Sequence, residues 1–300
     1  MAKKNEEVST VRRAKHGGIL TVIFAILSFL WIAPILIVFL NSFKRKAFIF
    51  THPFSLSCYS ITEGWEKFKA GITRAFCGWL NYSNGIRKTN LWECFGTSLF
   101  ITIGSVALII LCCSMCAWYI TRVHTKVTKT IYVLCLFSMI VPFQMVMFTL
   151  SKFANILHLS NPLGIIIVYL GFGAGLAVFM FTGFVKGISL EIEEAAMIDG
   201  CSPLQTFFKV VFPILKPTTV TVAILEAMWV WNDYLLPYLV LSSKYRTIPI
   251  AVQYLKQSHG QIDWGAMMAV LVLAILPIII FYIACQKYII EGVLAGAVKG

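Results

Sequence analysis

The segment FGTSLFITIGSVALIILCCSMCAWYIT, Phe95 to Thr121, runs for 27 residues without a charged side chain. A helix needs about 20 predominantly apolar residues to cross the hydrocarbon core of a bilayer, so this segment is long enough to span one. Five further stretches qualify in the same way: roughly Ile19 to Leu40, Ile131 to Leu150, Leu163 to Val185, Thr218 to Leu241 and Ala266 to Ile290. The sequence therefore predicts an all-α integral membrane protein with about six transmembrane helices.

The overall composition also indicates a membrane protein. Hydrophobic residues make up 59% of the 300 positions and charged residues 13%, and the mean hydropathy is +0.82. Soluble domains carry roughly 25% charged residues. The net charge is +12, but the Lys and Arg residues are scattered between apolar runs rather than clustered with aromatic residues. We expect the lipid bilayer to be a partner and nucleic acid not to be one.

The apolar pattern divides the chain into four parts. We expect residues 1–18 to form a basic cytoplasmic tail, 19–41 the first transmembrane helix, 42–93 an external segment and 94–300 the transmembrane core. The first apolar stretch exceeds the roughly 7 to 15 residues of a signal-peptide core and lacks an A-x-A cleavage site, so we expect it to remain as a span.

Basic residues do not decide the orientation by a simple count. Six spans would place both termini on one side, which then carries 13 Lys and Arg against 12 on the other. If the external segment is discounted, the count becomes 13 against 4. Segments approaching about 60 residues can cross a membrane largely regardless of charge, so this count favours cytoplasmic termini.

The external segment contains aromatic residues among Gly, Ser, Asn and Lys. They are Tyr59, Trp65, Trp79, Tyr82 and Trp92. Two structures remain open for it: an ordered cap or interfacial helices, and a solvated loop with aromatic anchors at the membrane surface. Cys58, Cys77 and Cys94 lie in the same part of the chain, so a disulfide between two of them is an alternative to free thiols.

No metal site is predicted from the cysteines and histidines. The histidines show no metal-ligand spacing; they are His16, His52, His124, His158 and His259. Several cysteines lie inside apolar runs, where buried inert thiols are expected: Cys112, Cys113, Cys116 and Cys135.

Prolines and small residues predict local features of the spans. A proline removes a helical hydrogen bond, so kinks are expected at the four prolines that lie inside predicted spans. These are Pro34, Pro142, Pro237 and Pro277. The fourth span contains the small residues Gly171, Gly173, Ala174 and Gly175, which allow another helix to approach closely.

Between the fourth and fifth spans lies SLEIEEAAMIDGCSPLQTFFKVVFPILKP, residues 189–217, which predicts two short helices. The first runs from about Leu190 to Asp199, with Ser189 as its N-cap and Gly200 ending it in the left-handed conformation. Acidic residues in its first turns favour the positive end of the helix dipole. Taken alone, such a pattern fits any helix-turn-helix connector between spans.

The second short helix begins with a capping-box pattern. Ser202 is its expected N-cap, Pro203 its first residue and Gln205 the partner three residues after the cap. We expect Pro213 and Pro217 to end this helix and to lead into the fifth span.

The spacing of residues in this segment resembles the EAA loop of the membrane subunits of ABC importers. Glu194, Ala195 and Ala196 are followed after three residues by Gly200, and Val210 and Phe212-Pro213 complete the form E-A-A-x3-G-x9-I-x-L-P. Phe212 stands where Leu is usual. The resemblance implies a type I ABC importer transmembrane domain whose cytoplasmic coupling helix docks on an ATP-hydrolysing subunit. The residues it implies for coupling are Glu193, Glu194, Ala195, Ala196, Asp199, Gly200 and Pro213.

Three further stretches are similar to the carbohydrate-importing branch, in particular to the shorter permease of the maltose-transporter type. They are VPFQ at 141–144, WNDYLLP at 231–237 and IIEGVLAGAVKG at 289–300, and the similarity covers about residues 92–300. It implies a heterodimer with a second permease, two ATPase subunits that use ATP and Mg, and an extracellular sugar-binding protein. This chain has no G-x-x-x-x-G-K-[ST] motif, so we expect it to bind no cofactor and to be no enzyme by itself.

Polar residues of the fifth span are candidates for a translocation pathway. An ionisable residue there costs about 2.5 to 3.5 kcal/mol on insertion scales, so Glu226 should face a cavity or a partner. Asp233 lies seven residues later and is expected on the same helical face. The full candidate set is Gln144, Glu226, Trp229, Asn232 and Asp233. The alternative is that these residues pack against the second permease.

The external stretch 242–264 matches in position the loop by which the family contacts its binding protein. Its tip combines an aromatic ring, hydrogen-bonding side chains and glycine, namely Tyr254, Gln257, Ser258, His259 and Gly260. A simple connector between spans is the alternative.

Other functions remain as alternatives. The chain could serve an ABC importer for another solute, such as peptides or amino acids, although 231–237 and the C-terminal GAVKG argue against this. An ion-driven secondary carrier would show internal repeats and an intramembrane ionisable pair and would need no docking loop. A scaffold protein would support no ATP-dependent flux.

Overall fold

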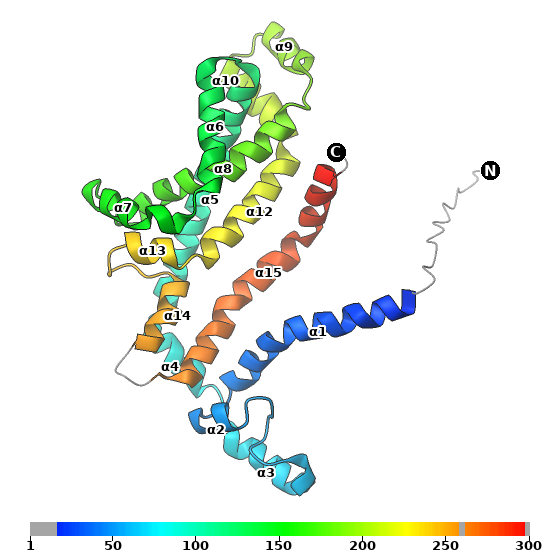
Figure 1. Cartoon of the computed structure of the whole chain (residues 1–300), viewed down its shortest axis with the longest axis vertical. Helices are drawn as coiled ribbons and strands as arrows, with labels where there is room; N and C mark the ends of the chain where they lie inside the picture. The colour runs from blue at the N-terminus through cyan, green and yellow to red at the C-terminus, as the bar shows by residue number, and fades with distance from the viewer. Residues whose placement is uncertain (1–16, 258–261, 298–300) are drawn as a thin grey trace, which may run out of the picture.

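The computed structural model describes residues 17–257 and 262–297, which are almost entirely helical (Figure 1). The elements are α1 (Gly17–Ser42), α2 (Lys46–Thr51), η1 (Ile61–Glu63), α3 (Trp65–Ala75), α4 (Leu80–Thr89), α5 (Leu91–Arg122), α6 (Lys126–Ile140), α7 (Phe143–Ile156), α8 (Pro162–Val185), α9 (Leu190–Ile198), α10 (Pro203–Thr206), the π-helical turn η2 (Phe207–Val211), α11 (Phe212–Ile214), α12 (Lys216–Asn232), α13 (Leu235–Val240), α14 (Ile248–Gln257) and α15 (Trp264–Ala297). The described residues contain no strand, which confirms the all-α prediction.

Four of these helices are each long and apolar enough to cross a membrane. They are 18–42, 91–122, 162–185 and 264–288. Two bent helix pairs, α6 with α7 and α10–α11 with α12, raise the number to six if each pair counts as one span. The predicted number of about six is therefore confirmed, but two of the predicted spans are not single straight helices.

The predicted span Ile131 to Leu150 is wrong as one helix. Helix α6 ends at Ile140, and α7 leaves it at an angle of 109°. Pro142 has no N–H to donate and disfavours helical geometry in the residue before it, and Val141 accordingly has φ −75° and ψ 114°. The expected kink at Pro142 is thus a complete break.

The predicted span Thr218 to Leu241 is also interrupted. Helix α12 ends at Asn232, where Asp233 takes an extended conformation and its carboxylate accepts hydrogen bonds from the backbone N–H groups of Leu235 and Leu236. Pro237 therefore lies in the short helix α13 rather than inside the span. Pro34 and Pro277, by contrast, lie inside α1 and α15 as predicted.

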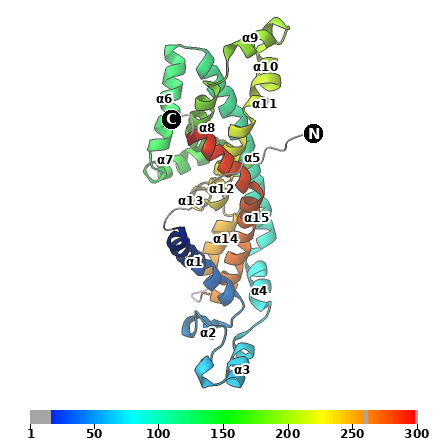
Figure 2. The ribbon, with the colours of Figure 1, turned by 90° about the vertical axis from the view of Figure 1, so that its right-hand side faces the viewer.

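Helix α8 occupies the centre of the bundle, between α5, α6 and α12 (Figures 1 and 2). Its small residues allow this packing. A Cβ atom added to Gly173 would lie 2.6 Å from Cδ1 of Ile109, and one added to Gly175 would lie 2.7 Å from the backbone oxygen of Cys135. The close helix approach predicted from this run is confirmed at these two positions, whereas Gly171 faces open space.

The segment 42–93 is ordered and helical, in agreement with the first of the two alternatives for it. Helix α4 packs against α15, and the Lys44 ammonium is buried, donating hydrogen bonds to Oδ1 of Asn41 at 2.9 Å and to the backbone oxygen of His52 at 2.8 Å. Helices α2 and α3 lie at the end of the molecule opposite α9 (Figure 1). Cys58, Cys77 and Cys94 are free thiols.

The packing of α8 can be tested with one methyl group. We expect Gly175→Ala to lower the thermal unfolding temperature of the protein in detergent, because its Cβ meets a backbone carbonyl that cannot rotate away. The matched variant Gly171→Ala should leave that temperature unchanged or raise it, because alanine favours a helix by about 1 kcal/mol over glycine and meets no atom there. Equal unfolding temperatures for the two variants would contradict this account of the α8 contacts.

Candidate functional site

Helix α9 projects at one end of the bundle, and its two ends are fixed by local interactions (Figure 1). The Ser189 hydroxyl accepts a hydrogen bond from the backbone N–H of Glu191. At the other end Gly200 has φ +88°, and the N–H groups of Gly200 and Cys201 donate to the carbonyls of Met197 and Ala196. This is the Schellman arrangement, which requires a left-handed residue after the helix. Both predicted ends of this helix are confirmed.

A buried ion pair attaches α9 to the end of α5. The Glu193 side chain accepts hydrogen bonds from Nε1 of Trp118 at 2.9 Å and from Nη2 of Arg122 at 2.7 Å. Arg122 Nη2 also donates to the backbone oxygen of Ile188, just before α9 begins. Glu193 is only 1% exposed. A charge removed from water to this degree is stable only when it is paired and hydrogen-bonded, as it is here.

The residues implied for coupling therefore divide into two groups. Glu194, Ala195, Asp199 and Gly200 are exposed on the outer face of α9, and Pro213 is exposed on α11. Glu193 and Ala196 are buried and face the bundle, so Glu193 offers no atom to an external partner. The structure thus separates a residue that positions α9 from residues that a partner could touch.

Apolar residues on the outer face of α9 were missed by the sequence analysis. Ile198 is 86% exposed, and Ile192 and Met197 are also exposed. Large apolar side chains grouped around charged ones at a surface indicate a protein contact. Trp118 and Arg122 were missed as well; their spacing of four residues places them on one face of α5, which was the available signal.

The second short helix begins as predicted but continues differently. Ser202 and Gln205 form the capping box. Pro213 and Pro217 do not end the helix: Pro213 lies within α11, and Pro217 lies in the first turn of α12, where a missing N–H costs nothing. The bend between α10–α11 and α12 is 77°. Phe207 packs its ring 5.4 Å from that of Trp118, so this segment is also attached to α5.

The ion pair can be tested separately from any partner. We expect Glu193→Ala to lower the unfolding temperature and to speed protease cleavage within 189–217, because removing one member of a buried pair typically costs about 3 to 5 kcal/mol. The matched variant Glu191→Ala removes an exposed carboxylate of the same helix and should change neither property. If Glu193→Ala were as stable and as protease-resistant as Glu191→Ala, the ion pair would not hold α9.

The candidate pathway residues are brought together in part. The Tyr169 hydroxyl of α8 donates to Oδ2 of Asp233 at 3.0 Å, and the Tyr169 ring meets Trp229 edge-on at 5.4 Å. Glu226 belongs to α12 and is 2% exposed. Its carboxylate lies beside Gly173 of α8, one helical turn from Tyr169. Tyr169 was not predicted, because a tyrosine in an apolar span gives no signal before its neighbours are known.

The remaining candidates lie apart from this group or on its border. Asn232 is exposed and donates to the backbone oxygen of Met228, and Gln144 is exposed on α7. Asp233 does not continue the α12 face as predicted, because the helix ends one residue before it. Neighbouring helices α5, α12 and α15 enclose an apolar cavity of about 560 Å³ whose lining includes Trp231. Besides Trp231, whose indole carries one N–H, the lining residues include a single hydroxyl, that of Thr102, so this cavity has few groups for sugar hydroxyls.

The predicted contact loop is described only up to its first residues. Tyr254 lies on α14, and the Arg246 guanidinium sits 4.0 Å from the centre of its ring. Gln257 ends α14, and Ser258, His259 and Gly260 lie outside the described residues. Asp263, just after the loop, pairs with Lys88. Burial raises the pKa of Asp263, but the hydrogen bonds from Lys88 and the Ala266 N–H together with the charges of Lys88 and Lys46 outweigh burial, so this pKa lies below its usual value.

A bundle of apolar helices long enough to span a bilayer defines a multi-pass membrane protein. Residues 109–294 match the family model described as the binding-protein-dependent transport system inner membrane component. The chain belongs to this family of transport permeases, and the resemblance seen in its sequence is confirmed.

Several known proteins are similar to this chain along nearly their whole length. A probable starch degradation products transport system permease protein, AmyC of Thermoanaerobacterium thermosulfurigenes, is 38% identical over 94% of this chain and 96% of its own. The multiple sugar-binding transport system permease protein MsmG of Streptococcus mutans is 31% identical over 94% of each chain. The melibiose/raffinose/stachyose import permease protein MelC of Bacillus subtilis is 30% identical over 96% of this chain and 99% of its own.

A solved structure has the same fold. It is the crystal structure of a bacterial ABC transporter involved in the import of the acidic polysaccharide alginate, and one of its chains superposes with a TM-score of 0.70. The match covers 96% of this chain and 99% of that chain at 21% sequence identity. The expected type I importer fold is therefore confirmed.

Proposed function

We propose that this chain is the permease subunit of an ATP-driven carbohydrate importer and that α9 is its coupling helix. The observation that carries the proposal is the construction of α9: its inner face is fixed to α5 by the Glu193–Arg122 pair, and its outer face exposes Glu194, Ala195 and Ile198. Two relatives are named for the transport of starch degradation products and for the import of melibiose, raffinose and stachyose. These names support carbohydrate as the substrate class.

In the proposed mechanism a separate ATPase subunit uses ATP and Mg and moves α9 when it closes. The Glu193–Arg122 pair and the Phe207–Trp118 contact would pass this movement to α5, and the α10–α11 segment would pass it to α12. These helices pack on α8, so the bundle would move as connected rigid parts and open alternately to each side. This chain contributes positions and contacts rather than bond-breaking chemistry.

The same proposal assigns the sides of the membrane and the other partners. The end with α9 would face the cytoplasm together with both termini, and the end with α2 and α3 would face outward, where an extracellular sugar-binding protein would meet the loop after α14. A second permease would complete the translocation pathway. Helix α1 packs on α15 and is otherwise exposed along its length, which leaves surface on which such a partner could pack. In this arrangement the polar residues of the fifth span and of α7 would face the second subunit or the pathway between the two; they are Glu226, Trp229, Asn232, Asp233 and Gln144.

Coupling can be tested by purifying the chain from membranes together with the products of its neighbouring genes. We expect the double variant Glu194→Lys, Gly200→Pro to insert normally but to retain at least about tenfold less ATPase subunit, since reversing an interface charge costs several kcal/mol. Gly200→Pro adds the loss of the left-handed turn that ends α9. ATP hydrolysis in the preparation should fall in parallel.

Two controls make this experiment specific. Glu66→Lys reverses an exposed charge on α3, at the opposite end of the molecule, and should retain ATPase as the wild type does. Gly200→Asn keeps a residue that tolerates the left-handed conformation and should retain more ATPase than Gly200→Pro. If the wild-type chain retains no ATPase subunit and uptake follows an ion gradient, an ion-driven carrier replaces the proposal.

The substrate class is tested separately, by comparing the uptake of labelled oligosaccharides with that of labelled peptides and amino acids.

A further inference from the structure

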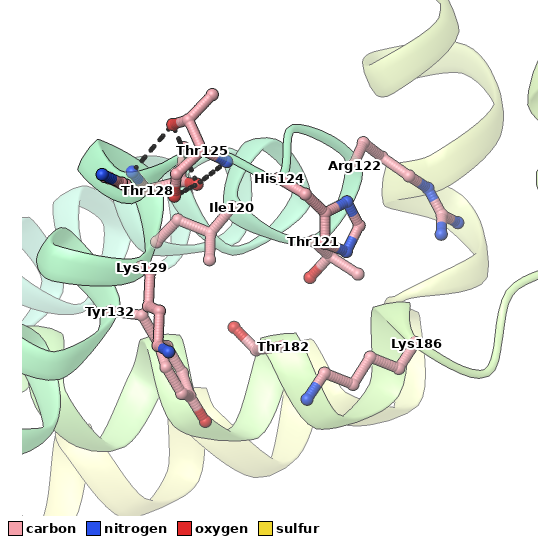
Figure 3. A pocket seen from close by; sticks show the side chains of 11 residues that line it. Ile120, Thr121, Arg122, His124, Thr125, Thr128, Lys129, Tyr132, Thr182 and Lys186 are labelled. Atoms are coloured by element: carbon pink, nitrogen blue, oxygen red, sulfur yellow. Dashed lines mark hydrogen bonds between the residues drawn. The ribbon is translucent and has the colours of Figure 1, made fainter.

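A cavity of about 690 Å³ lies at the same end of the bundle as α9, where α5 ends, α6 begins and α8 ends (Figure 3). Its lining is strongly basic: Arg122, His124, Lys126, Lys129 and Lys186 contribute to it, and no Asp or Glu is among its lining residues. Within the described part of the chain, Lys126, Lys129 and Lys186 take part in no ion pair. The coupling mechanism uses Arg122 and leaves the other four unexplained.

A buried hydroxyl points into the same space. Thr182 on α8 is 2% exposed, and its Oγ1 atom has no hydrogen-bond partner. In Figure 3 this oxygen is directed into the cavity, and the side chains of Lys129 and Lys186 extend toward it from opposite sides. An unpartnered buried hydroxyl is costly, so a polar group bound between the two ammonium groups would satisfy it.

We propose that this cavity binds a phosphate group, most directly that of an anionic phospholipid. The two lysines supply charge, and the Thr182 hydroxyl supplies a hydrogen bond. A cavity that concentrates positive charge in this way is suited to a compact anion and not to a neutral sugar.

Position and surroundings favour a lipid as the source of this phosphate. The cavity lies at the ends of α5, α6 and α8, the level at which lipid headgroups meet transmembrane helices. Helices α5 and α8, which end beside the cavity, are both long and apolar enough to span a membrane, so acyl chains of a lipid whose headgroup entered the cavity would lie along these spans. A soluble phosphate compound would use the same polar groups, but its binding would not require a cavity at the ends of membrane-spanning helices.

The site is adjacent to the connection between α9 and α5. Arg122 lines the cavity and also pairs with Glu193. A bound anion would therefore compete with the Glu193 carboxylate for the positive charge of this guanidinium. Lipid binding would thereby affect how firmly α9 is held. This consequence, and the placement of the cavity on the cytoplasmic side, rest on the proposed function; the phosphate site itself does not.

The test uses the transporter purified with its partners, and native mass spectrometry to count phospholipids bound per complex during titration with palmitoyl-oleoyl phosphatidylglycerol or the matching phosphatidylcholine. We expect one phosphatidylglycerol to bind the wild type preferentially, and its affinity to fall about 30-fold in Lys129→Gln, Lys186→Gln. Lys209→Gln, Lys216→Gln removes two exposed cations from the same end and should not change it. Thr182→Val should keep the fold, because it removes an unpartnered hydroxyl, yet weaken binding.

Further outcomes separate the sources and the rivals. If inorganic phosphate displaces phosphatidylglycerol and binds with the same dependence on Lys129 and Lys186, a soluble phosphate compound is the occupant and the phosphate site stands. If neither probe distinguishes the wild type from Lys129→Gln, Lys186→Gln, the proposal is overturned. It is also overturned if these lysines affect only retention of the ATPase subunit, because they would then meet an acidic protein surface. Absence of any ATPase from the wild-type preparation would contradict the proposed function, but the number of bound phospholipids could still be measured on the permease.

Discussion

Glu193 is a carboxylate on a projecting helix, yet it is almost completely shielded from water. Its two oxygens are occupied by the Trp118 indole and the Arg122 guanidinium, and the same guanidinium binds the backbone before α9. A short helix of nine residues is marginal on its own, because few hydrogen bonds offset the entropy lost on forming it. The buried pair gives α9 a defined position relative to α5, and every mechanical role proposed for α9 depends on that position.

The rest of the bundle provides a rigid base for this connection. Helix α8 has glycines where it meets α5, α6 and α12, so the backbones approach closely and side-chain adjustments are small. The two breaks at Val141–Pro142 and at Asp233 lie at the edges of this packed centre. Each break has its own local cause, a proline in one case and an aspartate cap in the other, so neither bend requires a partner to form.

One end of the molecule combines three features: a projecting helix with an apolar outer face, a buried ion pair and a basic cavity. Arg122 belongs to two of them, since it holds Glu193 and lines the cavity. In a membrane subunit this arrangement would let the lipid environment and the partner protein act on the same helix. The opposite end has a different character, with α2, α3 and α4 forming an ordered cap stabilised by the buried Lys44 and by packing on α15.

The sequence by itself determined the membrane class, the approximate number of spans, both ends of α9 and the family. These depend on apolar length, on capping residues such as Ser189 and Ser202 and on the turn residue Gly200, all of which act over a few neighbouring positions. Only the tertiary structure decided that Glu193 faces inward, that Tyr169 joins Asp233 and that Thr182 points into a basic cavity. Their partners lie tens of residues away along the chain, and only packing brings them together.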